Sequence, residues 1–175
     1  MYQYKNINFG FVIICPVCNS RHLKSTISSV DSYYSTTNKL VVLPKECKEE
    51  IRIKKCFSDS ALASMINTGM SKTECTEWNF IIFAGGVVKA RLELKYSCFI
   101  DNQKEILFPI IGRKLNFAES EFTLLLIHKK SFDEIGDFPK ENSFETSKIK
   151  WAATALEKGY RFKGIVGGKP FYTIP

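Results

Sequence analysis

The sequence lacks any long hydrophobic run. No stretch of its 175 residues approaches the roughly 18 consecutive apolar residues that a membrane-spanning helix needs. The opening residues, MYQYKNINFG, also lack the charged start and the small-residue cleavage site of a secretory signal peptide. These absences exclude an integral membrane segment as a sequence-based expectation, and we expect a cytoplasmic protein.

Dense blocks of one charge are missing as well, although basic residues outnumber acidic ones. The chain has 25 Lys and Arg against 18 Asp and Glu, which gives a net charge of +7. These cations are spread along the chain, so they indicate a solvated surface with some attraction for phosphates and other anions. We therefore expect no nucleic-acid partner. The length is typical of a single domain with a substantial core.

A second closely spaced pair of cysteines is also missing. Of the six cysteines only Cys15 and Cys18 are neighbours, whereas Cys47 and Cys56 stand well apart. This spacing argues against a zinc ribbon, and without a secretory signal an even count says little about disulfides. A C-x-x-C between a buried strand and a helix is nevertheless typical of a thioredoxin-like redox pair, whose first thiol has its pKa lowered by the helix N-terminus. A thioredoxin-like oxidoreductase that uses Cys15 and Cys18 therefore stays open as an alternative function.

The pattern of residues 8–34 predicts a strand, a tight loop and a helix. Phe9 to Ile14 is an uninterrupted apolar run, which suits a strand buried on both faces in a parallel sheet. The sequence CPVCNS then breaks the run, and apolar residues recur at helical spacing from Arg21 to Tyr34. Ligands of open α/β sheets bind beyond the carboxyl ends of the strands, so the loop is a candidate wall of a binding crevice.

Similar patterns predict the remaining elements. A second strand at 39–43 completes a β-α-β unit, in which the two strands are parallel neighbours. Further strands are predicted at 51–57, 78–83, 105–111, 123–127 and 160–166. Helices are predicted from a Ser58 or Ser60 cap to about Gly69, over 88–99, from a Ser131 cap to Gly136, and over 145–158, the last burying Ile149, Ala152, Ala153 and Leu156.

Three stretches, in this order, resemble motifs of the family 2 glycosyltransferases. Pro16-Val17-Cys18-Asn19 is similar to the P-V-Y-N loop that follows the first strand in that family. Residues 67–70 (NTGM) resemble the N-x-G-[IV] step, and residues 77–83 resemble the strand that leads to the metal site. Residues 126–138 are similar to the hydrophobic-basic-F-x-x-x-G-x-F segment, and residues 151–162 resemble the helix that closes the acceptor side. The resemblance covers about residues 9–165.

The resemblance implies a fold and a function. The fold is a three-layer α/β/α sandwich around a mostly parallel sheet, of the GT-A (nucleotide-diphospho-sugar transferase) type. It would form one domain over residues 1–175, with a core at about 9–165 and a C-terminal tail at 166–175. The function would be to bind a nucleotide sugar and to transfer the sugar to a saccharide or glycoconjugate acceptor, in a chain that could form homo-oligomers.

Two acidic anchors of the family are absent from this sequence. Its second strand ends in Leu43-Pro44 instead of an aspartate, and its third ends in Ala84-Gly85-Gly86 instead of D-x-D. The two carboxylates of D-x-D hold a divalent cation that neutralises the departing diphosphate. We therefore name no metal ligand, and we keep a second alternative: a non-catalytic sugar- or nucleotide-binding or assembly protein on the same fold.

The remaining site residues follow from the motifs. Glu145, at the start of the last helix, would be the base that takes the proton of the acceptor hydroxyl. Without a metal, the charge of the leaving diphosphate would be stabilised by cations, for which Lys45, Lys89, Arg91, Arg113 and Lys114 are candidates. The residues expected to contact the nucleotide-sugar donor are Pro16, Asn19, Arg21, Asn67, Gly85 and Gly86.

Overall fold

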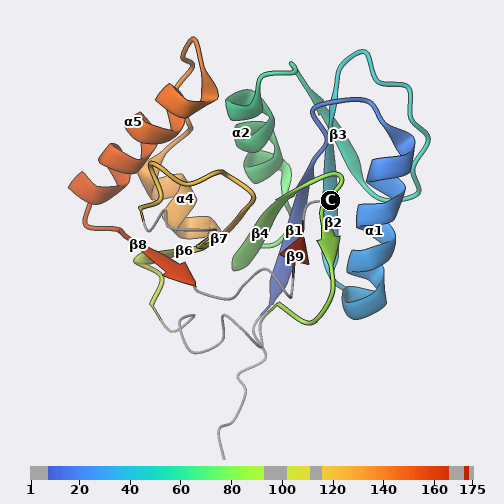
Figure 1. Ribbon diagram of the computed structural model, residues 1–175, viewed down its shortest axis with the longest axis horizontal. Coiled ribbons are helices and arrows are strands. Elements are labelled where there is room, and N and C mark those ends of the chain that lie inside the picture. The colour runs from blue at the N-terminus through green and yellow to red at the C-terminus, as the bar shows by residue number, and fades with distance from the viewer. Residues whose placement is uncertain (1–7, 93–101, 111–115, 166–171, 174–175) are drawn as a thin grey trace, which may run out of the picture.

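The computed structural model describes residues 8–92, 102–110, 116–165 and 172–173 (Figure 1). Its main feature is a seven-stranded sheet with the order β3-β2-β1-β4-β7-β6-β8. The strand β7 pairs antiparallel with both of its neighbours, and every other pairing in this sheet is parallel. The strands are β1 (Phe9–Ile14), β2 (Asn38–Pro44), β3 (Lys55–Ser58), β4 (Trp78–Phe83), β6 (Glu105–Pro109), β7 (Leu124–His128) and β8 (Arg161–Ile165).

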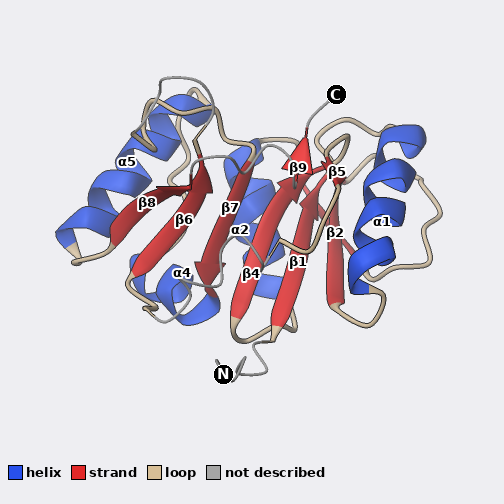
Figure 2. Cartoon of the chain, turned by 60° about the horizontal axis from the view of Figure 1, so that its bottom comes forward, coloured by secondary structure: helices blue, strands red, loops and turns tan. Residues whose placement is uncertain are grey.

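Helices cover both faces of the sheet, which confirms the predicted three-layer sandwich. Successive residues of β1 point to opposite faces: Phe11 and Ile13 pack in a core with α1, whereas Val12 and Ile14 pack in a core with α2, α4 and α5. Both cores need apolar side chains, which explains the uninterrupted apolar run of β1. Figure 2 shows α1 and α2 on opposite sides of the sheet. The helices are α1 (Ser20–Tyr34), α2 (Leu62–Lys72), α4 (Lys129–Ile135) and α5 (Phe144–Glu157).

The segment after β4 differs from the prediction. Residues 88–99 were expected to form a helix, but Val87–Val88 form the short strand β5 and residues 89–92 have no regular structure. Residues 93–99 of the predicted helix lie outside the described residues. The partner of β5 is β9 (Tyr172–Thr173), so part of the expected C-terminal tail adds a two-stranded ribbon to the fold.

The end of α2 also differs, because Gly69 has a packing role. A Cβ atom at Gly69 would lie 2.4 Å from Cγ1 of Val12 and 2.9 Å from Cγ2 of Val42. The glycine therefore lets α2 approach β1 and β2 closely, and the helix continues to Lys72 instead of ending near Gly69. The predicted serine cap is wrong too, since Ala61 occupies that position and has no side-chain cap bond.

The predicted buried face of α5 is largely wrong. Ile149 and Leu156 are 51% and 58% exposed, and Ala153 is exposed, whereas Ala152 is buried as expected. The rotation of the helix is set by Trp151, whose ring stacks on Phe138 at 4.3 Å and whose Nε1–H donates to the carbonyl oxygen of Gly136 at 2.8 Å. A large aromatic ring with a satisfied N–H outweighs the smaller aliphatic side chains in this choice.

Two other elements begin at residues that differ from the prediction. The strand predicted at 51–57 begins only at Lys55, and α4 begins at Lys129 with His128, not Ser131, as its N-cap.

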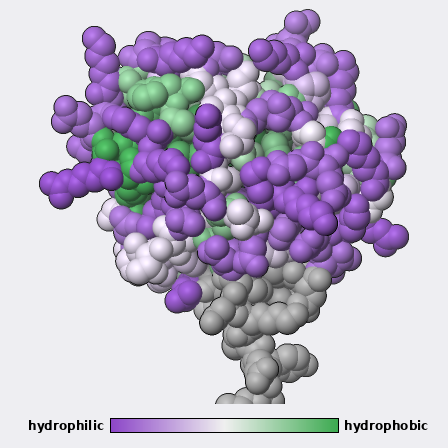
Figure 3. Space-filling model, turned by 180° about the vertical axis from the view of Figure 1, so that it is seen from behind, coloured by the Kyte–Doolittle hydropathy of each residue, from purple (hydrophilic) through white to green (hydrophobic). Residues whose placement is uncertain are grey.

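The surface seen from behind is mostly hydrophilic, with smaller hydrophobic areas between (Figure 3). None of the helices in the described segments combines the length and the apolar character needed to cross a membrane.

Candidate functional site

The loops that follow β1, β2 and β4 lie side by side at one edge of the sheet. The amide N–H of Ala84, just after β4, donates to the carbonyl oxygen of Ile14 at 2.8 Å. The N–H of Cys15, just after β1, donates in turn to the carbonyl oxygen of Val42 in β2 at 3.0 Å. This is the carboxyl edge of the parallel strands, where open α/β sheets bind their ligands. The loops after β1, β2 and β4 therefore adjoin one another where the sequence predicted a binding crevice.

The glycine turn after β4 is held against α1 by one buried threonine. Oγ1 of Thr26, which is fully buried, accepts the N–H of Gly85 at 2.8 Å and donates to the carbonyl oxygen of Gly86 at 2.8 Å. The N–H of Gly86 donates to the carbonyl oxygen of Phe83 at 3.0 Å. Gly85 has φ = +100°, which excludes most other residues. Both glycine N–H groups are thus bonded within the protein and are not free to bind a ligand. The missing side chains still allow a ligand to approach the backbone of the turn closely.

Thr26 was missed by the sequence reasoning, although a signal exists. It lies on the buried stripe of α1 between Leu23 and Val30, where every other buried position is apolar. A single hydroxyl on such a stripe needs a hydrogen-bond partner, and here the partner is the glycine turn.

The first turn of α1 lies beside the glycine turn and carries the exposed residues Arg21 and His22. Oδ1 of Asn19 accepts the N–H of His22 at 3.2 Å and so caps the helix. Arg21 and His22 are exposed, and Nδ1 of His22 lies 3.7 Å from the place where a Cβ of Gly85 would be. The start of α1, which carries Asn19 and Arg21, therefore lies beside the Gly85-Gly86 turn, and half-buried Pro16 follows β1.

A cavity of about 320 Å³ lies at the carboxyl ends of β2 and β3, beside the first turns of α2. Asn67 is in its lining, but its amide group is already used: Nδ2 donates to the carbonyl oxygen of Phe138 at 2.9 Å and Oδ1 accepts the N–H of Phe138 at 2.8 Å. Asn67 thus holds in place the segment after α4 that forms one wall of the cavity. The lining residues are Lys45, Phe57, Ser58, Asp59, Ser64, Asn67, Thr68, Asp137 and Lys140.

Glu145 lies on another part of the same edge. Ring contacts of 5.5 Å connect Phe83 at the end of β4 to Phe122, and Phe122 to Phe144, the residue before Glu145. The carboxylate of Glu145 is 66% exposed and lies 3.0 Å from Nζ of Lys148, whose side chain is fully buried. Nζ of Lys148 also donates to the carbonyl oxygen of Ser120. The sequence signal for this pair was the i,i+3 spacing of opposite charges on a helix.

The two neighbouring cysteines do not form a redox pair. Cys18 is joined by a disulfide to Cys47, which follows β2, so the sequence reasoning missed this bond. Cys15 has a buried thiol that donates to the carbonyl oxygen of Val17 at 3.1 Å, and burial raises the pKa of this thiol. A thioredoxin-like pair requires the opposite, a lowered pKa in a partly exposed thiol. The thioredoxin-like alternative is therefore wrong. Among the described residues, no three His, Cys, Asp or Glu side chains gather to hold a metal ion.

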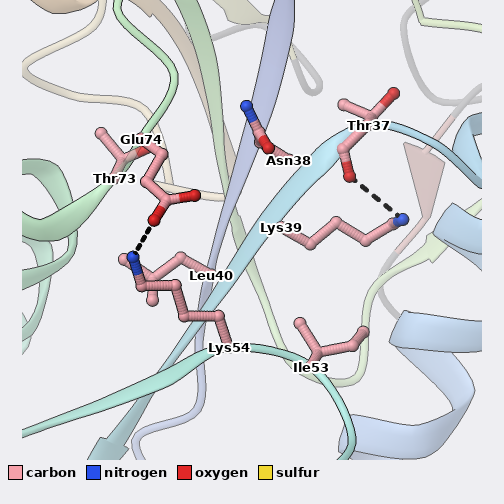
Figure 4. Close-up of a pocket in the computed structure, with 8 residues that line it drawn as sticks. All are labelled: Thr37, Asn38, Lys39, Leu40, Ile53, Lys54, Thr73 and Glu74. Carbon is pink, nitrogen blue, oxygen red and sulfur yellow. Dashed lines mark hydrogen bonds and ion pairs between the residues drawn. The ribbon is translucent and has the colours of Figure 1, made fainter.

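A second cavity, of about 230 Å³, lies at the opposite edge of the sheet, around the amino end of β2 (Figure 4). Its charged groups are already paired: Lys54 with Glu74, and Lys39 with Asp31 at 2.8 Å. Because its location is opposite to the carboxyl edge, we do not assign the ligand site to it. Its lining is Thr37, Asn38, Lys39, Leu40, Ile53, Lys54, Thr73 and Glu74.

No protein-family model matches the chain, and no curated protein matches it in sequence. Solved structures do match. The structure of GalNAc-T7 with UDP, GalNAc and Mn²⁺ shares 11% identity over 91% of this chain and 42% of its own, with a TM-score of 0.68. The mannosyltransferase PcManGT from Pyrobaculum calidifontis, in complex with GDP-Man and Mn²⁺, shares 12% identity over 92% of this chain and 57% of its own, with a TM-score of 0.66.

A nucleotidyltransferase also shares the fold. The 2-C-methyl-D-erythritol 4-phosphate cytidylyltransferase from Thermus thermophilus has 8% identity over 98% of this chain and 93% of its own, with a TM-score of 0.59. The present chain spans about half the length of the two glycosyltransferase structures. At these identities the similarity shows the fold alone, which is that of GT-A glycosyltransferases and nucleotidyltransferases.

Proposed function

We propose that the protein binds a nucleotide-sugar donor at the carboxyl edge of its sheet and transfers the sugar to a saccharide or glycoconjugate acceptor. The observation that supports this most is the meeting of the loops after β1, β2 and β4 on a sheet whose order includes one reversed strand. The same fold is seen in structures that contain UDP or GDP-Man at this low identity.

The donor is proposed to span two neighbouring places on this edge. The nucleoside would enter the cavity at the ends of β2 and β3, where the 44% exposed ring of Phe57 offers a stacking surface and Lys45 a charged contact. The role of Asn67 in this proposal is to hold the cavity wall through Phe138. The diphosphate would extend toward Pro16, Asn19 and Arg21 and the Gly85-Gly86 turn.

The charge of the leaving diphosphate would be met by side-chain cations. Ala84-Gly85-Gly86 supplies no carboxylate for a metal, while Arg21 is exposed in the first turn of α1 and Lys45 lines the cavity. Of the other cations predicted from the sequence, Arg113 and Lys114 lie outside the described residues. Positioned cations stabilise a developing anion in the same way as a metal ion does. We therefore expect donor binding to be independent of Mn²⁺.

Glu145 is the proposed base for the acceptor hydroxyl. Its carboxylate is exposed at the start of α5, so an acceptor can reach it, and the ion pair with Lys148 restrains its position. The second candidate function is donor binding without transfer, which the missing carboxylates at residues 84–86 favour. The substitution Glu145→Gln distinguishes transfer from binding alone. If the protein transfers the sugar, the variant should lose transfer and keep its affinity for the donor; if the protein only binds the donor, no transfer is seen in either form.

Calorimetric titration with UDP-, GDP- and CMP-sugars, with Mn²⁺ or with EDTA, tests the proposed function. One donor class is expected to bind with the same affinity in both conditions, and Arg21→Ala should weaken it. The matched control is Arg52→Ala, an exposed arginine in the loop before β3. Absence of binding to every donor would contradict the proposal.

A further inference from the structure

The disulfide Cys18–Cys47 joins the two loops that form the proposed donor site. Cys18 lies in the loop after β1, one residue before the α1 cap Asn19, and Cys47 lies two residues after Lys45 in the segment that follows β2. The two cysteines are 29 residues apart in sequence. The bond is therefore a covalent tie across the carboxyl ends of β1 and β2.

The segment that carries Cys47 has few backbone hydrogen bonds near the carboxyl edge of the sheet. The N–H of Lys45 donates to the carbonyl oxygen of Ser58 at 2.9 Å, and the N–H of Cys47 closes a turn to Pro44 at 3.0 Å. From there to the start of β3 at Lys55, residues 48–54 form no helix or strand. Segments with few ordered backbone hydrogen bonds open locally at low free energy. Loss of the disulfide would therefore loosen the segment that follows Lys45, which lines the cavity and whose own N–H stays bonded to Ser58.

The bond is open to attack from one side. Cys18 is exposed, whereas Cys47 is only 5% exposed. Because the residue is exposed, we expect an external thiolate to reach the bond from the Cys18 side, and exposed disulfides are the labile and regulatory ones. Once reduced, Cys18 would lie just before the N-terminus of α1, a position at which a helix dipole favours negative charge.

We propose that this disulfide is a redox control of the donor site. In the oxidised protein the tie holds the loops after β1 and β2 in the arrangement that binds the donor, and reduction releases them and weakens binding. This inference rests on the proposed function for its ligand. Disulfides persist in oxidising compartments, whereas dithiol reductants open exposed ones, so the state of the bond would follow the redox poise around the protein.

The reductant is a dithiol, and the exchange balances. One thiolate of the dithiol attacks Sγ of Cys18, which forms a mixed disulfide and releases Cys47 as a thiolate that takes up a proton. The second thiol of the dithiol then attacks the reductant's first sulfur, which is bonded to Sγ of Cys18. This step releases Cys18 and leaves the dithiol as a cyclic disulfide. Two electrons and two protons pass from the dithiol to the protein.

The test compares oxidised and dithiothreitol-reduced protein by hydrogen exchange and by donor titration. Reduction is expected to speed exchange in residues 15–23 and 44–50 while β4 stays protected, and to weaken donor binding about tenfold, because the loops must then be ordered on binding. The double variant Cys18→Ser/Cys47→Ser should behave like the reduced protein. Cys56→Ser, which changes a cysteine that is not in the disulfide, should behave like the oxidised one.

The possible results distinguish a failure of the redox control from a failure of the proposed function. Equal donor affinity in the two redox states, or tighter binding after reduction, would overturn the redox control while leaving the proposed function intact. If the oxidised protein binds no donor, the proposed function fails, and the redox control of a donor site fails with it. Global unfolding on reduction, seen as loss of the far-ultraviolet circular dichroism, would also overturn it, since the proposed release is local.

Discussion

Nζ of Lys148 lies 3.0 Å from the carboxylate of Glu145, one helical turn away, and only the lysine is fully buried. The buried ammonium is otherwise contacted by the carbonyl oxygen of Ser120 and faces the ring of Phe117 at 5.9 Å. Glu145 is thus the only acidic partner that the described residues show for this cation. A buried charge that loses its partner is destabilising, whereas an apolar residue of similar size can replace a buried charge at little cost.

The first prediction is a coupling between these two residues. Glu145→Gln should lower the free energy of unfolding by about 1 kcal/mol, a modest value because the carboxylate is mostly exposed. The same change in a Lys148→Met background should have almost no effect, because no buried cation is then left without its partner. Urea denaturation of the four proteins measures the coupling, and Glu157→Gln, an exposed acid at the end of α5, is the control. Equal effects of Glu145→Gln in both backgrounds would show that the pair is not coupled.

The second prediction concerns Thr26 and the glycine turn. Thr26→Val keeps the shape of the side chain but leaves the N–H of Gly85 and the carbonyl oxygen of Gly86 without their partner. Buried groups of this kind destabilise by about 1–3 kcal/mol each when unsatisfied. Thr26→Val should therefore lower stability by about 2 kcal/mol and weaken donor binding, while Thr26→Ser should retain both. Chemical denaturation and calorimetry check this, and a Val variant with unchanged donor affinity would separate the turn from the donor site.

The third prediction is a pH dependence that comes from His128. This residue caps α4 by accepting the N–H of Lys130 at Nδ1 (3.2 Å), and its ring meets Trp78 edge-on at 5.4 Å. Burial lowers the pKa of His128; Glu77 acts in the opposite direction and Lys130 in the same one. Between the ordinary imidazole pKa of about 6.5 and the lower folded value, the unfolded chain binds more protons, so stability should fall as the pH drops through this window.

His128→Asn provides the control for that pH effect. Asparagine is a good N-cap and does not titrate, so the variant should lose part of the stability decrease between about pH 7 and pH 5. Urea midpoints of both proteins across this range measure the difference. Parallel pH profiles for the two proteins would remove His128 as the cause.

The fourth prediction is the contribution of the disulfide to stability. Closing a loop of 29 residues stabilises a protein by about 3–4 kcal/mol in the chain-entropy account. The free energy of unfolding of the Cys18→Ser/Cys47→Ser variant should be lower by about this amount under oxidising conditions. Under reducing conditions the variant and the unmodified protein should be equal. A difference that persists after reduction would mean that the serines themselves perturb the loops.

The sheet was predictable because its strands carry strong local signals. The runs predicted at 9–14 and 78–83 match β1 and β4 to the residue, because strands buried on both faces are mostly apolar. Asn79 is the polar exception in β4, and its buried amide is hydrogen-bonded to Thr73 and Cys75. The family resemblance implied a mostly parallel sheet, but the pairing of β7 on both sides depends on contacts between distant residues and was not predicted. The face of α5 was not predictable from periodicity, because Trp151 and the buried Lys148 outweigh the aliphatic pattern of Ile149 and Leu156.

The location of the candidate site was predictable from the sequence, but most of the contacts that build it were not. The loop after β1 and the glycine turn were located correctly at the carboxyl edge, because a break after a buried strand marks it. The Cys18–Cys47 bond, the Thr26 hydrogen bonds and the cavity beside α2 join residues far apart in the sequence. Such pairings depend on tertiary packing, which the C-P-V-C spacing alone misrepresented as a redox pair.

The most direct test of the central claim is to locate the donor by amide chemical-shift changes in ¹⁵N-labelled protein, using the donor that binds best in the calorimetric panel. We expect changes clustered at the carboxyl edge, in residues 17–22, 45–47, 57–68 and 84–88. Changes clustered instead around Thr37–Leu40 and Glu74, at the cavity of the opposite edge, would contradict it.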